Sequence, residues 1–242
     1  MKNITLTLLL LVIIFAFKSD RDEEGMFLMS HLSSLDLKKA GLEIDVDEIY
    51  NEEKPALVNA LVRLGGCTGS FISESGLIIT NHHCVFSSVA GASSSENNYL
   101  ENGFYAAKKE QEIKTTLPVR ITQSYVDVSE LVLTDISETT DALLKRDIIS
   151  DNIKAIVEKE QAKYPNLTVE VSEMLVGKSY TLFRYKTLND VRLVYVPPKN
   201  IGKFGGESDN WEWPRHNGDF SIVRAYENNM PYQPEAHLEV NP

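Results

Sequence analysis

A short segment bounded by the chain's two cysteines places the strongest constraint on the fold. Cys67 and Cys84 lie 17 positions apart. Between them, two runs with β-strand composition, at 68–72 and 76–80, are separated by a Ser-Glu-Ser-Gly turn sequence. This pattern predicts a β-hairpin, because β-branched and aromatic residues favour strands and the Ser/Gly cluster favours a turn. The Asn-His-His sequence that precedes Cys84 would then lie directly after the second strand, at the end of the hairpin away from the turn.

The N-terminus indicates export. Lys2 supplies a positive charge, and residues 4–17 form an apolar run that suits a signal peptide and is short for a membrane helix. We therefore expect residues 1–18 to be a signal peptide and the protein to be periplasmic, secreted or at the cell surface. A retained N-terminal anchor is the alternative. In an oxidising compartment Cys67 and Cys84 would pair, although two free buried thiols are also compatible with the sequence.

The composition narrows the classes of function. A hydrophobic content of 43% is enough for a globular core. A net charge of −11 disfavours nucleic-acid binding, because phosphate contacts need clustered Lys and Arg side chains. The acidity is compatible with cationic ligands, including a peptide with a free amino terminus. Solubility alone would also account for it.

The remaining pattern predicts a mainly β fold with helical insertions. Apolar residues recur at helical spacing in 55–64 and, among many charges, in 136–163, where we expect an inserted helical segment. Residues 87–98 are rich in Ser, Gly and Asn and are expected to form a loop. Further strands are expected at 117–128, 131–133, 167–171, 179–185, 190–195 and 220–226.

The histidine pair is the first candidate for chemistry. On a strand, His82 and His83 would point to opposite faces, so one of them at most can serve a given site as general base. Two structural histidines are the simpler interpretation of such a pair. A metal site built from His82, His83, His216 and Asp219 is a third, but adjacent histidines do not bind one ion and the usual ligand spacing is missing. We therefore expect neither a metal nor a cofactor.

Two long motifs resemble one known family. They are Cys-Thr-Gly with Thr-Asn-His-His-Cys, at 67–84, and Gly-Lys-Phe-Gly-Gly with Asp-Asn-Trp, Trp-Pro-Arg-His and Gly-Asp-Phe, at 202–220. The combination is similar to the bacterial dipeptidyl-peptidase family that includes dipeptidyl peptidases 7 and 11, which are chymotrypsin-like serine peptidases. The resemblance covers nearly all of the chain after residue 18. It implies removal of dipeptides from free amino termini, no cofactor, and a homodimer of the full-length protein.

The resemblance also implies roles for particular residues. His83, directly before the cysteine, would be the general base, and Asp219 would accept its Nδ1 proton. The Cys67–Cys84 disulfide would hold the base in place. Asn210 and Trp211 would hold the substrate's amino terminus, because an amide oxygen accepts from an ammonium group and an indole face attracts a cation. Without the family, the tryptophans of this segment would be interpreted as core residues and Asp219 as a turn residue.

The sequence offers no nucleophile in the expected order. Ser221 lies too close to Asp219, and Ser208 precedes Asp219 and lacks the following glycine of a Gly-x-Ser-Gly turn. We therefore expect residues 19–242 to be the first part of a double β-barrel peptidase domain, truncated before its helical domain and second barrel and inactive alone. An exported non-catalytic peptide-binding protein is the alternative function. An unrelated exported β-rich binding protein, which would carry free thiols, is a further one.

Overall fold

The computed structural model describes residues 27–51, 53–137, 140–203 and 216–240, so the expected signal peptide lies outside the described residues. The chain divides into two compact units after Ala56. In the first unit, the described elements are a 3-10 helix, Met29–Ser34, and the short helix α2, Val46–Ile49. The backbone N–H of Asp45, which precedes α2, donates to Glu48 Oε1 at 3.4 Å. This bond satisfies a donor that the start of a helix otherwise leaves unpaired.

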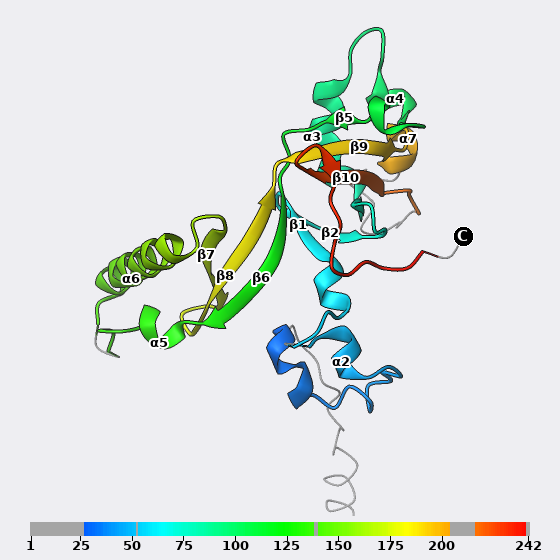
Figure 1. The fold of residues 1–242 in the computed structure, drawn as a ribbon. Coiled ribbons are helices and arrows are strands. Elements are labelled where there is room, and N and C mark those ends of the chain that lie inside the picture. The colour runs from blue at the N-terminus through cyan, green and yellow to red at the C-terminus, as the bar shows by residue number, and fades with distance from the viewer. Residues whose placement is uncertain (1–26, 52, 138–139, 204–215, 241–242) are drawn as a thin grey trace, which may run out of the picture. The chain divides into compact units, whose positions relative to one another are not determined.

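The second unit is built on one antiparallel sheet (Figure 1). Its described strands are β1 (Leu61–Leu64), β2 (Cys67–Phe71), β3 (Leu77–Thr80), β4 (Phe104–Tyr105), β5 (Ile113–Lys114), β6 (Val119–Asp127), β7 (Thr168–Leu175), β8 (Ser179–Leu188), β9 (Asp190–Val196), β10 (Ser221–Glu227) and β11 (Met230–Pro231). The strands pair in the order β4-β9-β10-β3-β2-β1-β6-β8-β7, while β5 pairs with β9 and β11 with β10. The mainly β character expected from the sequence is confirmed.

The hairpin between the cysteines is formed by β2 and β3. Phe71 pairs with Ile78 and Gly69 with Thr80, and the Ser73 hydroxyl accepts the backbone N–H of Leu77 at 3.1 Å across the turn. Gly76 closes this turn with a φ of +72°. A Cβ at this position would lie 2.8 Å from two backbone carbonyl oxygens, so both the conformation and the close packing require glycine.

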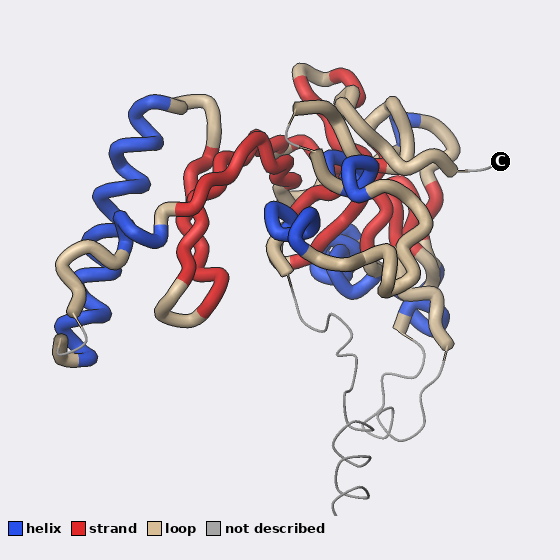
Figure 2. Tube along the Cα trace, turned by 90° about the horizontal axis from the view of Figure 1, so that it is seen from below, coloured by secondary structure: helices blue, strands red, loops and turns tan. Residues whose placement is uncertain are grey.

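The long strands β6 and β8 connect two hydrophobic cores. The larger core gathers buried residues from β1, β2, β3, β9 and β10, including Leu64, Phe71 and Leu193. The smaller core lies at the other end of β6 and β8, where Tyr180 and Leu182 pack with apolar residues of helix α6, Ala142–Lys163. Figure 2 shows α6 lying beside the strands at that end. The helix is continuous and lies within the segment for which the sequence predicts helices.

The described part of the second unit also has four shorter α-helices: α3 (His82–Ala92), α4 (Tyr99–Asn102), α5 (Ser129–Val132) and α7 (Lys199–Gly202). Three sequence-based expectations are wrong here. The helix expected at 55–64 is a short 3-10 helix followed by β1, the strand expected at 131–133 belongs to α5, and much of the loop expected at 87–98 belongs to α3. In the described part of the chain, no helix is both long and apolar enough to cross a membrane.

Candidate active site

The histidine pair opens a helix instead of ending a strand. β3 ends at Thr80, Asn81 occupies the N-cap position, and α3 begins at His82. Successive residues of an α-helix are about 100° apart around its axis, so the two rings still point in different directions. His82 is buried, whereas 67% of the His83 side chain is exposed. The two rings therefore have different surroundings, as expected from the sequence, but the reason is helix geometry and not the alternation of a strand.

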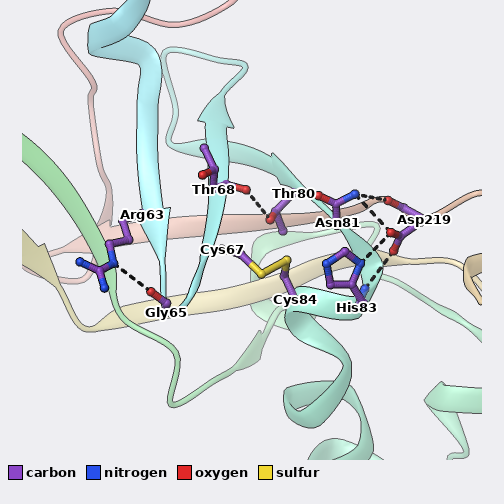
Figure 3. The surroundings of a disulfide bond; sticks show 9 residues. All are labelled: Arg63, Gly65, Cys67, Thr68, Thr80, Asn81, His83, Cys84 and Asp219. Carbon is purple, nitrogen blue, oxygen red and sulfur yellow. Dashed lines mark hydrogen bonds and ion pairs between the residues drawn. A yellow bond between two sulfur atoms is a disulfide. The ribbon is translucent and has the colours of Figure 1, made fainter. Parts of the chain in front are cut away.

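The disulfide predicted between Cys67 and Cys84 is confirmed. Cys67 begins β2, and Cys84 lies in the first turn of α3, with 6.0 Å between their Cα atoms. The cross-link therefore joins the start of the hairpin to the helix turn that carries His83 (Figure 3). It restricts the movement of that turn relative to the sheet.

Sheet register brings Asp219 to the same place. β10 pairs with β3 so that Ser221 lies opposite Thr80, which puts the residues just before β10 beside those just after β3. Asp219 Oδ2 lies 2.7 Å from His83 Nδ1, and Asp219 Oδ1 accepts the backbone N–H of His83 at 3.0 Å. The two residues are 136 positions apart in the sequence. The carboxylate therefore contacts both the ring and the backbone of one histidine.

The surroundings of Asp219 keep its carboxyl ionised. Burial raises its pKa, but hydrogen bonds from the His83 backbone and ring and from the Asn81 amide outweigh burial, so the pKa lies below its usual value. An ionised carboxylate only accepts hydrogen bonds, so the ring atom that faces it, Nδ1, carries a proton. In the neutral ring the other nitrogen, Nε2, is then the acceptor. Among the described residues, no serine hydroxyl forms a hydrogen bond with His83.

Asn81 is a member of the site that sequence reasoning missed. Its side-chain Nδ2 donates to the backbone carbonyl of Asp219 at 3.1 Å and to Asp219 Oδ2 at 3.2 Å. Figure 3 shows the Asn81 amide and the His83 ring on the same carboxylate. The available signal was an asparagine between a strand and a histidine pair, a position that equally suits an ordinary helix cap.

His82 packs inward against α7. A Cβ on Gly202, the last residue of α7, would lie 2.7 Å from two ring atoms of His82, and the Phe86 ring lies edge-on to the histidine ring. Among the residues that the structure describes, neither ring nitrogen of His82 has a hydrogen-bond partner. Burial lowers the pKa of this histidine, the charge of Asp219 partly opposes that effect, and the nearby His83 adds to it. His82 is therefore a neutral, buried ring.

The other residues considered from the sequence concern substrate binding, the nucleophile and metal binding. Asn210, Trp211 and Ser208 lie outside the described residues. The described ends of that segment meet, because the backbone N–H of Gly218 donates to the carbonyl of Ile201 at 3.0 Å. For metal binding, the described chain offers one close group of potential ligands, Cys67, His83 and Cys84. The two sulfur atoms of that group are bonded to each other and cannot act as thiolate ligands.

The curated proteins that are similar in sequence to this chain are dipeptidyl peptidases. The chain is 40% identical over 223 residues to a dipeptidyl-peptidase 7 of Capnocytophaga gingivalis, an alignment covering 88% of this chain and 31% of the relative. It is 36% identical over 239 residues to an Asp/Glu-specific dipeptidyl-peptidase of Porphyromonas gingivalis, covering 90% of this chain and 33% of the relative. The chain thus spans about a third of the length of these relatives.

Solved structures and the family comparison agree with these relatives. The crystal structure of Porphyromonas endodontalis DPP11 in complex with the dipeptide Arg-Asp matches with a TM-score of 0.77 and 34% identity, covering 90% of this chain and 34% of that one. The structure of the same enzyme in complex with substrate matches with a TM-score of 0.76 and 35% identity. Residues 22–242 match the Peptidase S46 family. The chain therefore belongs to the peptidase S46 family.

Proposed function

We propose that the protein is a serine-type dipeptidyl peptidase that releases dipeptides from the free amino terminus of peptides. The observation that carries the proposal is the His83–Asp219 pair, in which the carboxylate accepts both the ring Nδ1–H and the backbone N–H of one histidine. The relatives named dipeptidyl peptidases support the reaction class. In this proposal the nucleophilic serine is supplied by sequence beyond these 242 residues, and the chain alone is inactive.

The proposed chemistry follows from the protonation of the pair. His83 Nε2 accepts the proton of the serine hydroxyl while the serine oxygen attacks the carbonyl carbon of the second peptide bond. Asp219 stabilises the imidazolium that forms. The imidazolium then gives its proton to the leaving amine, the bond breaks, and the dipeptide remains as an ester on the serine. Water, deprotonated by His83, hydrolyses the ester and restores the enzyme.

The finer architecture belongs to the same proposal. We assign the described sheet to the first part of a chymotrypsin-like double β-barrel, with α6 in a helical insertion. Asn210 and Trp211 would hold the amino terminus of the substrate, which limits release to dipeptides. Export through a signal peptide at 1–18 agrees with the Cys67–Cys84 disulfide, since such bonds persist in oxidising compartments. Homodimerisation of the full-length protein, which the resemblance implies, is checked by light scattering after gel filtration.

Release of fluorogenic dipeptides by the full-length protein tests the proposal. Substrates with an acidic or a hydrophobic second residue are compared, each with a free and with an acetylated amino terminus. We expect turnover of free but not acetylated substrates. Asp219→Asn should lower kcat about 10⁴-fold, since it favours the wrong tautomer of the base, and His83→Ala should abolish turnover. His31→Ala is the control, because His31 is exposed and lies in the other unit.

Two results would contradict the proposal. Undiminished turnover by the His83→Ala variant would remove the base assignment. Binding of peptides by the wild-type protein without any release of dipeptides would favour the alternative, an exported non-catalytic peptide-binding protein.

A further inference from the structure

We infer that Asn81 is a positioning residue that holds the Asp219 carboxylate in place for His83, an inference that rests on the proposed function. The first observation is that the Asn81 side chain does not form the usual N-cap hydrogen bond. Asparagine is favoured at the N-cap of a helix because its side-chain oxygen accepts a backbone N–H of the first turn. Asn81 is the N-cap of α3, yet its side chain makes no such bond. Its amide is directed to Asp219 instead.

Asp219 takes over the capping role. Its Oδ1 accepts the backbone N–H of His83, the second residue of α3 and one of the donors that the helix leaves unpaired. A carboxylate at this end of the helix is also stabilised by the helix dipole. The capping acceptor of α3 therefore comes from a residue 136 positions away, while the local asparagine fixes that acceptor. The two residues have exchanged the roles that the sequence alone would give them.

The chemistry of the contact requires a donor at position 81. Both partners of the Asn81 side chain are oxygens of Asp219, one a backbone carbonyl and one a carboxylate. Neither oxygen can donate, so the group that faces them is the NH₂ of the amide, with one hydrogen for each. A single residue thereby fixes both the backbone and the side chain of Asp219. The carboxylate cannot rotate away from His83 without losing the Asn81 bond.

This arrangement matters for the proposed reaction because Oδ2 is shared. Asp219 Oδ2 accepts from Asn81 Nδ2 and faces His83 Nδ1 at 2.7 Å. Catalysis requires this oxygen to stay aimed at Nδ1 while the ring gains and loses a proton at Nε2. Only 22% of the Asp219 side chain is exposed, so water replaces a lost donor poorly. Asn81 itself need not touch the substrate to affect the rate.

The Asn81→Asp substitution separates positioning from capping. Aspartate is as good an N-cap as asparagine, so α3 should fold. The new carboxylate, however, can only accept, and it faces the Asp219 carboxylate. In the full-length peptidase we expect kcat for dipeptide release to fall roughly 10- to 100-fold, the effect of losing one hydrogen bond to a charged group. KM should stay within about twofold, because the substrate site is untouched.

Asn98→Asp is the matched control. Asn98 is the N-cap of α4, and its side-chain oxygen accepts the backbone N–H of Glu101 at 3.2 Å, the ordinary capping bond. An aspartate keeps that acceptor, so kcat should not change. Equal losses of kcat in both variants, or no loss in Asn81→Asp, would overturn the inference.

A second measurement does not depend on turnover. The carboxyl carbon of Asp219 is titrated by NMR in the wild type and in Asn81→Asp. In the described part of the chain, the titratable groups that face this carboxyl are His82, His83 and, in the variant, the new aspartate. Like charges in contact raise a carboxyl pKa, so the midpoint should rise in the variant, and an unchanged midpoint would refute the contact. If the wild type releases no dipeptides while the midpoint moves, the proposed function fails and the Asn81–Asp219 contact stands.

Discussion

Replacing Gly202 by alanine should strain the packing that supports the histidine pair. The added Cβ would lie 2.7 Å from His82 Cγ and Cδ2 and 3.1 Å from Nδ1, closer than carbon atoms pack. The ring is 1% exposed and cannot swing into solvent. Overpacking of this kind costs about 1–3 kcal/mol. The usual gain from Gly→Ala at an unstrained position, about 0.4–1 kcal/mol, offsets only part of that cost.

The structure predicts that this penalty depends on His82. In a His82→Ala background the three ring atoms nearest the new Cβ are absent, and the same Gly202→Ala change should become neutral or mildly stabilising. The coupling between the two positions in a double-mutant cycle should therefore be about 1–3 kcal/mol, as for residues in direct contact. Gly91→Ala is the control, because Gly91 lies in α3 with nothing within 4 Å of its added Cβ, and it should stabilise the helix by up to about 1 kcal/mol.

Hydrogen exchange of the α3 amides measures the effect directly in the full-length protein. It reports local opening and does not require the whole chain to unfold in one step. A net loss of about 1–2 kcal/mol corresponds to roughly 5- to 30-fold faster exchange in Gly202→Ala. The reasoning is refuted if Gly202→Ala changes exchange by the same factor with and without the His82 ring.

Three further predictions follow from the site and its support. Replacing Cys67 and Cys84 by serine should destabilise the second unit by about 3 kcal/mol, the chain-entropy value for a loop of 17 residues, and an unchanged urea midpoint would argue against a constraining role. Asp219 has a lowered pKa in the folded protein, so its contribution to stability is present above the unfolded pKa near 3.8 and is lost as pH falls through the folded value. The Asp219→Asn variant should therefore lose less stability in acid than the wild type, and equal acid losses in urea unfolding of the two proteins would contradict this. Glu112→Ala should lower the free energy of unfolding by about 3–5 kcal/mol, because it removes the ion-pair partner of Arg224, whose side chain is 10% exposed and lies 2.9 Å from Glu112. Thermal unfolding measures the change, and a loss below about 1 kcal/mol would refute the prediction.

The local sequence was sufficient to predict secondary structure where the residue types within a segment strongly favour one kind of element. The β2–β3 hairpin and the strands β8 to β10 follow directly from their β-branched and aromatic runs. The stretch that contains β1 has a misleading local pattern, because Leu57, Leu61 and Leu64 suit a helical stripe. The segment is a strand instead because β2 and β6 pair with it on its two edges, and burial then alternates along it, with Val62 and Leu64 inside and Arg63 outside. Neither neighbour is visible in the local sequence.

Tertiary packing also explains why α3 was missed. Its composition, with serines, alanines and a glycine after Phe86, is typical of a loop. Val85 and Val89 are fully buried at i and i+4, so contact with the larger core stabilises a helix that the local sequence alone favours weakly. The roles of His83 and Asp219 came from the family resemblance, and their contact depends on a strand pairing that local pattern does not encode. Asn81 was missed because the sequence does not show where an asparagine side chain points.

The contact between Asp219 and His83 is thus a property of one strand register. Side chains alternate along a strand, so a slip of one residue between β10 and β3 would turn Asp219 away from α3 and present a neighbour in its place. The register is fixed at both ends of the pairing. At one end, Asn81 and the His83 backbone hold Asp219; at the other, the backbone N–H of Ala225 donates to the Gly76 carbonyl at 3.0 Å in the hairpin turn. The turn glycine, seven residues before His83 at the opposite end of β3, therefore contributes to the geometry of the pair.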